Sequence, residues 1–133
     1  TRARLEEAGW TPGDGPVVQG AAGSSRADGR ADMERAAELL ADELNAPVHH
    51  GFIAAIDPKF HEVVAEHQPK FAATYLLADG FFSGKMRRDA ESTGVPVKVA
   101  APLVNAQGGA SAAVVAECFI DRMDAAIAQL DAA

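Results

Sequence analysis

The sequence predicts an α/β fold in which helices cover both sides of a doubly wound, four-stranded parallel sheet with flavodoxin-like topology. Short apolar segments alternate with helical segments along the chain, and the predicted strands begin roughly 25 to 30 residues apart, as in repeated strand–helix units. The apolar segments do not alternate with polar residues, which is typical of strands that are covered on both faces. Right-handed connections between parallel strands then place helices on both sides, so the sequence predicts three layers.

The length fits one domain with its own hydrophobic core. The chain has 133 residues, of which 48% are hydrophobic and 23% are charged, as in ordinary globular proteins. We expect a single domain over residues 1–133, with residues 1–15 as a lead-in to the first strand. Because the sequence begins with Thr1 rather than Met, we expect this domain to be one lobe of a longer protein.

The charge balance and the single cysteine exclude several classes of function. A net charge of −7 argues against a nucleic-acid partner, which would need a basic face. The chain has neither an apolar run long enough to span a membrane nor a signal-peptide pattern, so we expect no membrane partner and a cytoplasmic location. Cys118 has no second cysteine with which to form an internal disulfide or a cysteine-based zinc site.

The first third of the chain predicts a strand between two helices. Residues 1–9 form a short helical pattern that Gly9 ends, and residues 16–19 are an apolar segment too short for a helix. Apolar residues then recur at helical spacing from 31 to 44, with charged residues on the other side. Asn45, which precedes Ala-Pro, is a favourable end for that helix.

The middle of the chain repeats the pattern. Residues 48–56 predict the second strand. Asp57 and Pro58 are a favourable cap and first turn for the helix that follows. Residues 71–78 predict the third strand, which is buried.

The last third predicts a loop at 79–84, a helix at 85–92 and a strand at 95–101. A long helix follows from 110 to 130. Its larger apolar residues are spaced alternately by four and three positions: Ala116, Ile120, Met123, Ile127 and Leu130. This spacing predicts one continuous apolar stripe.

Ligands of such sheets bind beyond the carboxyl ends of the strands, where four loops meet in this prediction: 19–30, 54–58, 79–89 and 101–109. Five of the twelve Lys and Arg residues fall in two of these loops: Arg26, Arg30, Lys85, Arg87 and Arg88. With Phe81 and Phe82 they indicate a positive, partly aromatic mouth for a ligand that bears carboxylates or phosphates. Alternatively, residues 85–88 are the solvated first turn of a helix.

Serine and histidine side chains leave further alternatives. Ser24 and Ser25 either bind an anion or cap the following helix, and neither lies in the setting of a hydrolase nucleophile. The four histidines show no recognised metal spacing: His49, His50, His61 and His67. Adjacent residues of a strand point to opposite faces, so His49 and His50 should separate, whereas Asp57 and His61 could meet at the helix start.

Taken in order, these loops resemble the sirohydrochlorin chelatase (CbiX-type) family, whose relatives include the cobaltochelatases. The resemblance covers nearly all of residues 16–130. The matching pieces are Gly23-Ser24-Ser25, Ala31-Asp32, Gly51-Phe52-Ile53, Asp57-Pro58, 77–89, Ala101-Pro102-Leu103 and Asp121-Arg122. The resemblance implies a chelatase-like fold and a tetrapyrrole ligand that bears carboxylates. It also implies Co²⁺ or Fe²⁺ as the substrate metal.

The chain departs from the family at the positions that do the chemistry. The catalytic histidine of the family's His-Gly-Ser motif falls on Ala22, and its second histidine falls on Lys85 or Met86. An acidic position of the family falls on Ala54. Alanine and methionine cannot accept the pyrrole protons, and a protonated lysine would repel a divalent ion. The chain therefore resembles the histidine-less lobe of a two-lobed chelatase.

The predicted sites follow from both arguments. No catalytic residue is assigned. The candidate substrate-binding residues are Gly23, Ser24, Ser25, Arg26, Phe82, Ser83, Lys85 and Arg87. The candidate metal ligands are His50 and Asp57.

Three hypotheses remain open at this point. In the first, the domain forms one wall of a tetrapyrrole cleft, and a second lobe or a homodimer partner supplies the catalytic groups. In the second, the domain is an enzyme by itself that uses His49, His50 or Asp57. In the third, it is a non-catalytic module of the same fold that binds an anion or nucleotide or mediates assembly.

Overall fold

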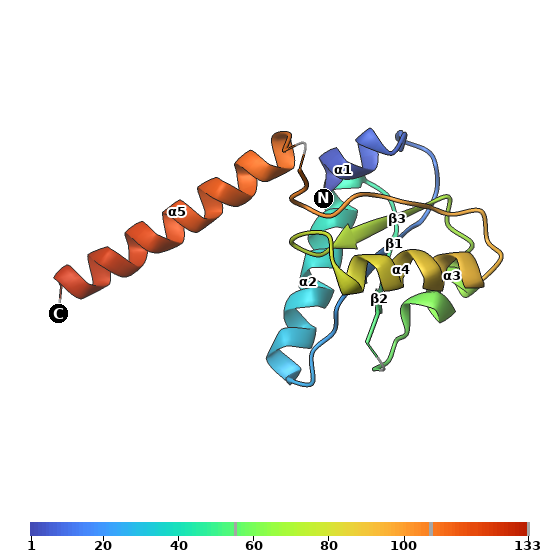
Figure 1. Cartoon of the computed structure of the whole chain (residues 1–133), viewed down its shortest axis with the longest axis horizontal. Coiled ribbons are helices and arrows are strands. Elements are labelled where there is room, and N and C mark those ends of the chain that lie inside the picture. Colours follow the sequence, from blue (N-terminus) through green and yellow to red (C-terminus); the bar gives the residue numbers. More distant parts are fainter. Residues whose placement is uncertain (55, 107, 133) are drawn as a thin grey trace.

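A computed structural model describes residues 1–54, 56–106 and 108–132, and it confirms the predicted fold class. Four parallel strands form one sheet in the order β2-β1-β3-β4 (Figure 1). The strands are β1 (Val17–Ala21), β2 (Val48–Phe52), β3 (Phe71–Tyr75) and β4 (Lys98–Val99). Every residue of the central strand β1 is buried, as expected for a strand covered on both faces.

Helices cover both faces of this sheet. One face carries α1 (Arg2–Glu7) and α2 (Ala27–Leu44), whose apolar side chains join one buried cluster. The other face carries α3 (Phe60–His67) and α4 (Phe81–Ser92), whose apolar side chains join a second cluster. The two clusters make the predicted three-layer arrangement.

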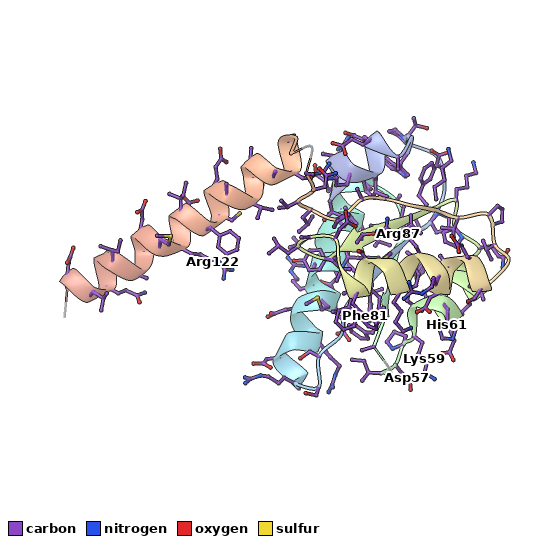
Figure 2. All side chains as sticks on the ribbon, viewed as in Figure 1. Asp57, Lys59, His61, Phe81, Arg87 and Arg122 are labelled. Atoms are coloured by element: carbon purple, nitrogen blue, oxygen red, sulfur yellow. The ribbon has the colours of Figure 1, made fainter. Side chains whose placement is uncertain are left out.

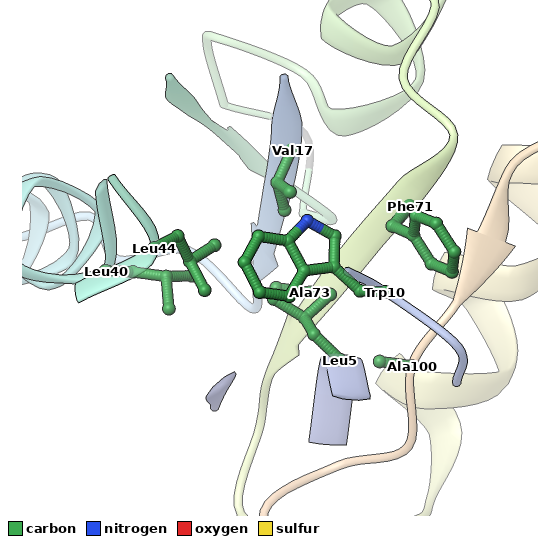
Figure 3. Close-up of a cluster of buried hydrophobic side chains, with 8 residues drawn as sticks. All are labelled: Leu5, Trp10, Val17, Leu40, Leu44, Phe71, Ala73 and Ala100. Atoms are coloured by element: carbon green, nitrogen blue, oxygen red, sulfur yellow. The ribbon is translucent and has the colours of Figure 1, made fainter. Parts of the chain in front are cut away.

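The first cluster shows how the N-terminal segment becomes part of the core (Figure 3). Leu5 of α1 and Trp10 are 0% and 2% exposed, and both pack against residues of β1, α2 and β3. Ala100, just beyond β4, closes the cluster on the far side. Residues 1–15 are therefore more than a lead-in, because they cover the sheet face that α2 leaves open.

Helix α2 ends at Asn45 as the sequence predicts, and α3 ends in the same way. Asn45 ends α2 and Gln68 ends α3, each with a left-handed backbone and a φ of 48°. A proline follows within two residues in both cases, at Pro47 and Pro69, and prevents the helix from continuing.

Several predicted boundaries are wrong. Residues 81–84, predicted as loop, are the first turn of α4, because the Ser83 hydroxyl accepts a hydrogen bond from the Gly80 N–H (2.9 Å) and caps the helix there. Helix α3 begins at Phe60 with Lys59 as its cap, rather than at Asp57. The second and third strands end at Phe52 and Tyr75, earlier than predicted.

The C-terminal helix α5 (Ala110–Asp131) projects away from the layered body (Figure 1). Of its described residues only Ser111 is buried. The predicted apolar stripe is present, but the described part of the chain does not cover it.

Helix α3 lies very close to the sheet at Gly51. A Cβ added at Gly51 would lie 2.6 Å from the backbone Cα of Phe60, whereas a Cβ added at Gly20 would lie 2.6 Å from the flexible end of Met86. These two glycines are neighbours in the register of β1 and β2. The backbone of α3 cannot move away without leaving the core, but the Met86 side chain can adjust.

We therefore expect Gly51→Ala to lower the free energy of unfolding by about 3 kcal/mol, and Gly20→Ala to lower it by about 1 kcal/mol. Urea unfolding of both variants beside the parent chain measures the difference. Equal losses for the two variants would show that the approach of α3 to β2 is not the limiting contact.

Candidate functional site

A cavity of about 370 Å³ opens at the carboxyl end of β2, at the edge where the sequence predicts a ligand. Its walls come from three segments: the end of β2, the start of α3 and the start of α4. The lining residues are Phe52, Ile53, Ala54, Lys59, His61, Phe81, Phe82 and Lys85. Figure 2 shows that Lys59, His61 and Phe81 lie near one another around this region.

The start of α3 reaches the cavity through a tight connection. The Phe52 N–H donates a hydrogen bond to the Pro58 carbonyl (2.7 Å), and Lys59 pairs with Phe52 as in a parallel sheet. This pairing holds Lys59, the residue before α3, against the end of β2. Lys59 and His61 are thereby held beside Phe52.

Two phenylalanines form the apolar wall. Phe81 is 72% exposed and Phe82 is 39% exposed, and their rings meet edge to face with centroids 5.5 Å apart. Two adjacent exposed rings form an apolar surface on which a flat ring can stack.

Two lysines supply the positive charge of the cavity. The Lys85 ammonium lies 2.6 Å from Asp89, and the Lys59 ammonium lies 3.7 Å from Glu62. Neither carboxylate lines the cavity. Each lysine is therefore oriented by an acidic residue of its own helix, and a carboxylate ligand would meet ammonium groups that are already in place.

Lys85 and Met86, the two alternatives for one family position, have different environments. Met86 is 0% exposed and packs in the core with Phe60 and Ala90. Lys85 lines the cavity. Only Lys85 can therefore contact a ligand.

Ala22 and Ala54 lie side by side. The Ala54 N–H donates a hydrogen bond to the Ala22 carbonyl (3.0 Å), and a Cβ added at Gly23 would lie 3.3 Å from the Ala54 Cβ. The two family positions thus adjoin one another, and both carry only a methyl group, which can neither accept a proton nor bind a metal.

The polar side chains of the predicted loop 19–30 form hydrogen bonds within that segment. The Ser24 hydroxyl accepts a hydrogen bond from the Arg26 N–H (3.1 Å), and the Arg26 guanidinium binds Asp28 through two hydrogen bonds of 3.0 and 2.7 Å. Arg30 donates to the carbonyls of Ser24 and Ser25 at 3.4 and 3.3 Å. Gly23, Ser24, Ser25 and Arg26 do not line the cavity.

Ser83 and Arg87 also contribute to local structure. Ser83 is 3% exposed and caps α4, while Arg87 donates to Asp79 at 2.7 Å. Neither residue lines the cavity. Of the predicted binding residues, the structure brings Phe82 and Lys85 into the cavity.

The candidate metal ligands lie apart. His50 Nε2 is 3.8 Å from Glu34 on the α2 face, whereas Asp57 is exposed in the turn before α3. Among the described residues no three His, Cys, Asp or Glu side chains are grouped so that they could hold a metal ion. The expected separation of His49 from His50 is confirmed, because His49 stacks on His67 of α3 with ring centroids 3.5 Å apart.

Sequence reasoning missed Lys59 and His61 as cavity residues. Both were treated as part of an ordinary helix that starts at Asp57. The available signal was their position just after the predicted loop 54–58, which follows a strand at the edge where the sequence places the ligand.

The comparisons with known proteins give a fold. No protein family and no curated protein matches this sequence. Among solved structures, "SirB from Bacillus subtilis with Fe3+" is similar, with a TM-score of 0.67 and 24% sequence identity. The similarity covers 76% of this chain and 44% of SirB, so the chain spans less than half the length of that protein. The chain has the chelatase-like fold of SirB, a four-stranded parallel sheet flanked by helices.

Among the described residues, no helix is both long and apolar enough to traverse a lipid bilayer.

The stacked histidine pair makes stability depend on pH. Burial lowers the pKa of His49 below the ordinary value of about 6.5, and the nearby His67 lowers it further. The unfolded chain therefore binds this proton more readily than the folded chain does. The stability that neutral His49 provides is fully present above about pH 6.5 and is lost as the pH falls toward the lowered pKa.

We expect His49→Phe to flatten the pH dependence of stability, because phenylalanine keeps a ring against His67 but cannot be protonated. Urea unfolding at pH 7.5, 6.5 and 5.5 measures this dependence. Parallel curves for the variant and the parent chain would contradict the assignment to His49.

Proposed function

We propose that this domain binds a tetrapyrrole that bears carboxylates, and that it forms one wall of a cleft whose catalytic groups come from a second lobe or subunit. The observation that carries the proposal is the cavity at the end of β2, in which two exposed phenylalanines lie beside two lysines and a histidine. The substrate metal would be iron or cobalt.

The chemistry of the cavity suits such a ligand. A tetrapyrrole presents a flat apolar ring, which stacks on exposed aromatic side chains. Its carboxylates lie at the edge of the ring, where Lys59 and Lys85 offer charged donors. The cavity of about 370 Å³ would hold part of the macrocycle, which agrees with a single wall of a larger cleft.

The dependence on a second lobe follows from what the residues cannot do. Metal insertion needs a base that removes the pyrrole protons and ligands that deliver the ion. Ala22 and Ala54 carry methyl groups, and a protonated Lys85 repels a divalent cation. His61 is the single imidazole that lines the cavity, and the described residues do not surround it with further metal ligands.

The comparison with SirB supports this proposal in two ways. Its structure contains Fe³⁺, which agrees with iron as the substrate metal. The similarity covers less than half of SirB, which agrees with a second lobe in the working assembly. Cobalt remains part of the proposal through the resemblance of the loops to the CbiX-type chelatases.

Binding can be tested with uroporphyrin or sirohydrochlorin, whose visible spectra change on contact with protein. We expect Lys85→Ala and Lys59→Ala each to weaken binding by about 1–2 kcal/mol, or roughly 5- to 30-fold, because each removes one charged pair. Lys70→Ala is the matched control, since Lys70 directly precedes β3, at the opposite edge of the sheet, and pairs with Asp14.

Arg87→Ala distinguishes binding in the cavity from binding by the loop residues that the sequence predicts. Because Arg87 is held by Asp79 outside the cavity, its loss should weaken binding much less than the loss of Lys85. No spectral change up to about millimolar porphyrin would contradict the proposal, at a concentration where even weak complexes form. Thermal stabilisation by phosphate or nucleotides, but not by porphyrins, would favour the alternative of an anion-binding module.

The dependence on a second lobe has its own test. With Co²⁺ or Fe²⁺ and a bound tetrapyrrole, the isolated domain should insert metal no faster than the uncatalysed solution reaction. Faster insertion that His61→Ala or His50→Ala abolishes would overturn this part and show an enzyme that works by itself.

A further inference from the structure

The apolar face of α5 has no partner in the described part of the chain. Six large side chains on this helix are between 51% and 76% exposed. Val114 lines a groove beside the body, and the other five lie farther along the helix: Phe119, Ile120, Met123, Ile127 and Leu130. The helix leaves the body at its first turn and stands clear of it along most of its length (Figure 1). A helix with this much exposed apolar surface marks an interaction site.

The larger apolar residues of α5 fit two heptads of a coiled coil. Ile120 and Ile127 occupy one repeating position, and Met123 and Leu130 occupy the next one three residues later. In the heptad notation these are positions a and d. β-Branched isoleucine at a, with leucine or methionine at d, favours two parallel helices over higher assemblies.

The charged residues of α5 argue for the same arrangement. Glu117, Asp124 and Asp131 recur every seventh residue along one edge of the stripe, at position e. In a parallel pair these carboxylates face position g of the second helix, which holds Phe119 and small residues. In an antiparallel pair with the same stripes aligned, position e faces position e, so Glu117 would lie opposite Asp131 and Asp124 opposite the Asp124 of the other helix.

The same charges exclude a lipid surface. A helix that lies on a membrane carries Lys and Arg on its polar face. Helix α5 has a single basic residue, Arg122, and four acidic residues: Glu117, Asp121, Asp124 and Asp131. Anionic lipid would therefore repel it.

The start of α5 is attached to the body, and the apolar stripe of the helix faces away from the body. The Arg4 side chain is 3% exposed and donates to the carbonyls of Leu103 (3.2 Å) and Gly108 (2.7 Å), which binds the preceding loop to α1. Ser111 and Val115 line a groove against α1 and α2. These residues lie on the side of the helix opposite the apolar stripe, so the body does not obstruct a second helix.

The exposed area meets the requirement of a weak dimer. A phenylalanine buries roughly 150–250 Å², and the aliphatic side chains of the stripe are somewhat smaller. The five side chains together therefore expose on the order of 500 Å² per copy, so a pair that buried all of this surface would bury about 1,000 Å², the least that a specific interface needs.

We propose that two copies of this chain associate through their α5 helices, packed in parallel along the Ile120–Leu130 stripe. The partner is a second copy because the a and d pattern is self-complementary and because the acidic edge meets no carboxylate across a parallel pair. This inference does not depend on the ligand of the cavity.

Light scattering during size-exclusion chromatography of the whole chain at about 100 μM tests the association, at a concentration suited to a micromolar dimer. We expect twice the chain mass of 13.8 kDa. Ile127→Glu should raise the dissociation constant at least tenfold, whereas Ala125→Glu, on the outer side of α5, should leave it unchanged. Both substitutions lie outside the core, so both variants should keep the thermal unfolding temperature of a folded body.

Cross-linking tests the direction of the helices. In a Cys118→Ser background, Leu130→Cys should form a disulfide between copies in a parallel pair, and Ile120→Cys should do so as well. Cross-linking in a mixture of Ile120→Cys and Leu130→Cys chains, but in neither variant by itself, would overturn the parallel arrangement. A monomer at 100 μM, or a dimer that Ile127→Glu and Ala125→Glu affect equally, would overturn the interface.

Discussion

The close approach of α3 to β2 at Gly51 is the contact on which the candidate site depends. Because residue 51 has no side chain, the backbone of Phe60 can lie against the strand, and Phe60 itself is completely buried. This contact fixes the point at which α3 begins. Lys59 and His61, on either side of Phe60, are then directed to the cavity rather than into the core.

Met86 has a similar part on α4. It packs beneath β1 at Gly20 and against Phe60, so α3 and α4 share one buried cluster. The residue before it, Lys85, therefore faces the cavity while Met86 faces the core. Phe60 holds the start of α3 in the core, and Met86 holds α4 there in the same way. Aromatic and basic side chains from these two helices therefore lie around the same cavity.

The sequence was sufficient for the three layers and the doubly wound parallel sheet. Uninterrupted apolar strands must be covered on both faces, and a helix with one apolar face must bury that face. These two patterns together predict a sheet between two layers of helices. The ends of elements were harder to predict. The Phe-Phe-Ser-Gly segment has the composition of a loop, yet the Ser83 cap makes it helical. Phe81 and Phe82 therefore lie in the first turn of α4 rather than in the predicted loop.

The site was predicted only in part because side-chain pairing depends on three-dimensional neighbours. Arg26 and Arg87 have the right charge and lie near the right edge, but Asp28 and Asp79 engage them. Lys85 also pairs with a carboxylate, that of Asp89, but it still lines the cavity. The sequence could not distinguish Lys85 from the two arginines that pair outside the cavity. Helix α5 presents the same difficulty, since its apolar stripe is readable in the sequence but its position outside the body is not.

The proposed ligand site is the cavity formed by β2, α3 and α4. Mapping of amide ¹H–¹⁵N chemical shifts during addition of uroporphyrin would locate the bound ligand, because every backbone N–H reports in one experiment. We expect the largest changes at residues 52–54, 59–61 and 81–85. Changes centred on residues 23–30, or no changes in any of these segments, would show that the ligand does not bind in this cavity.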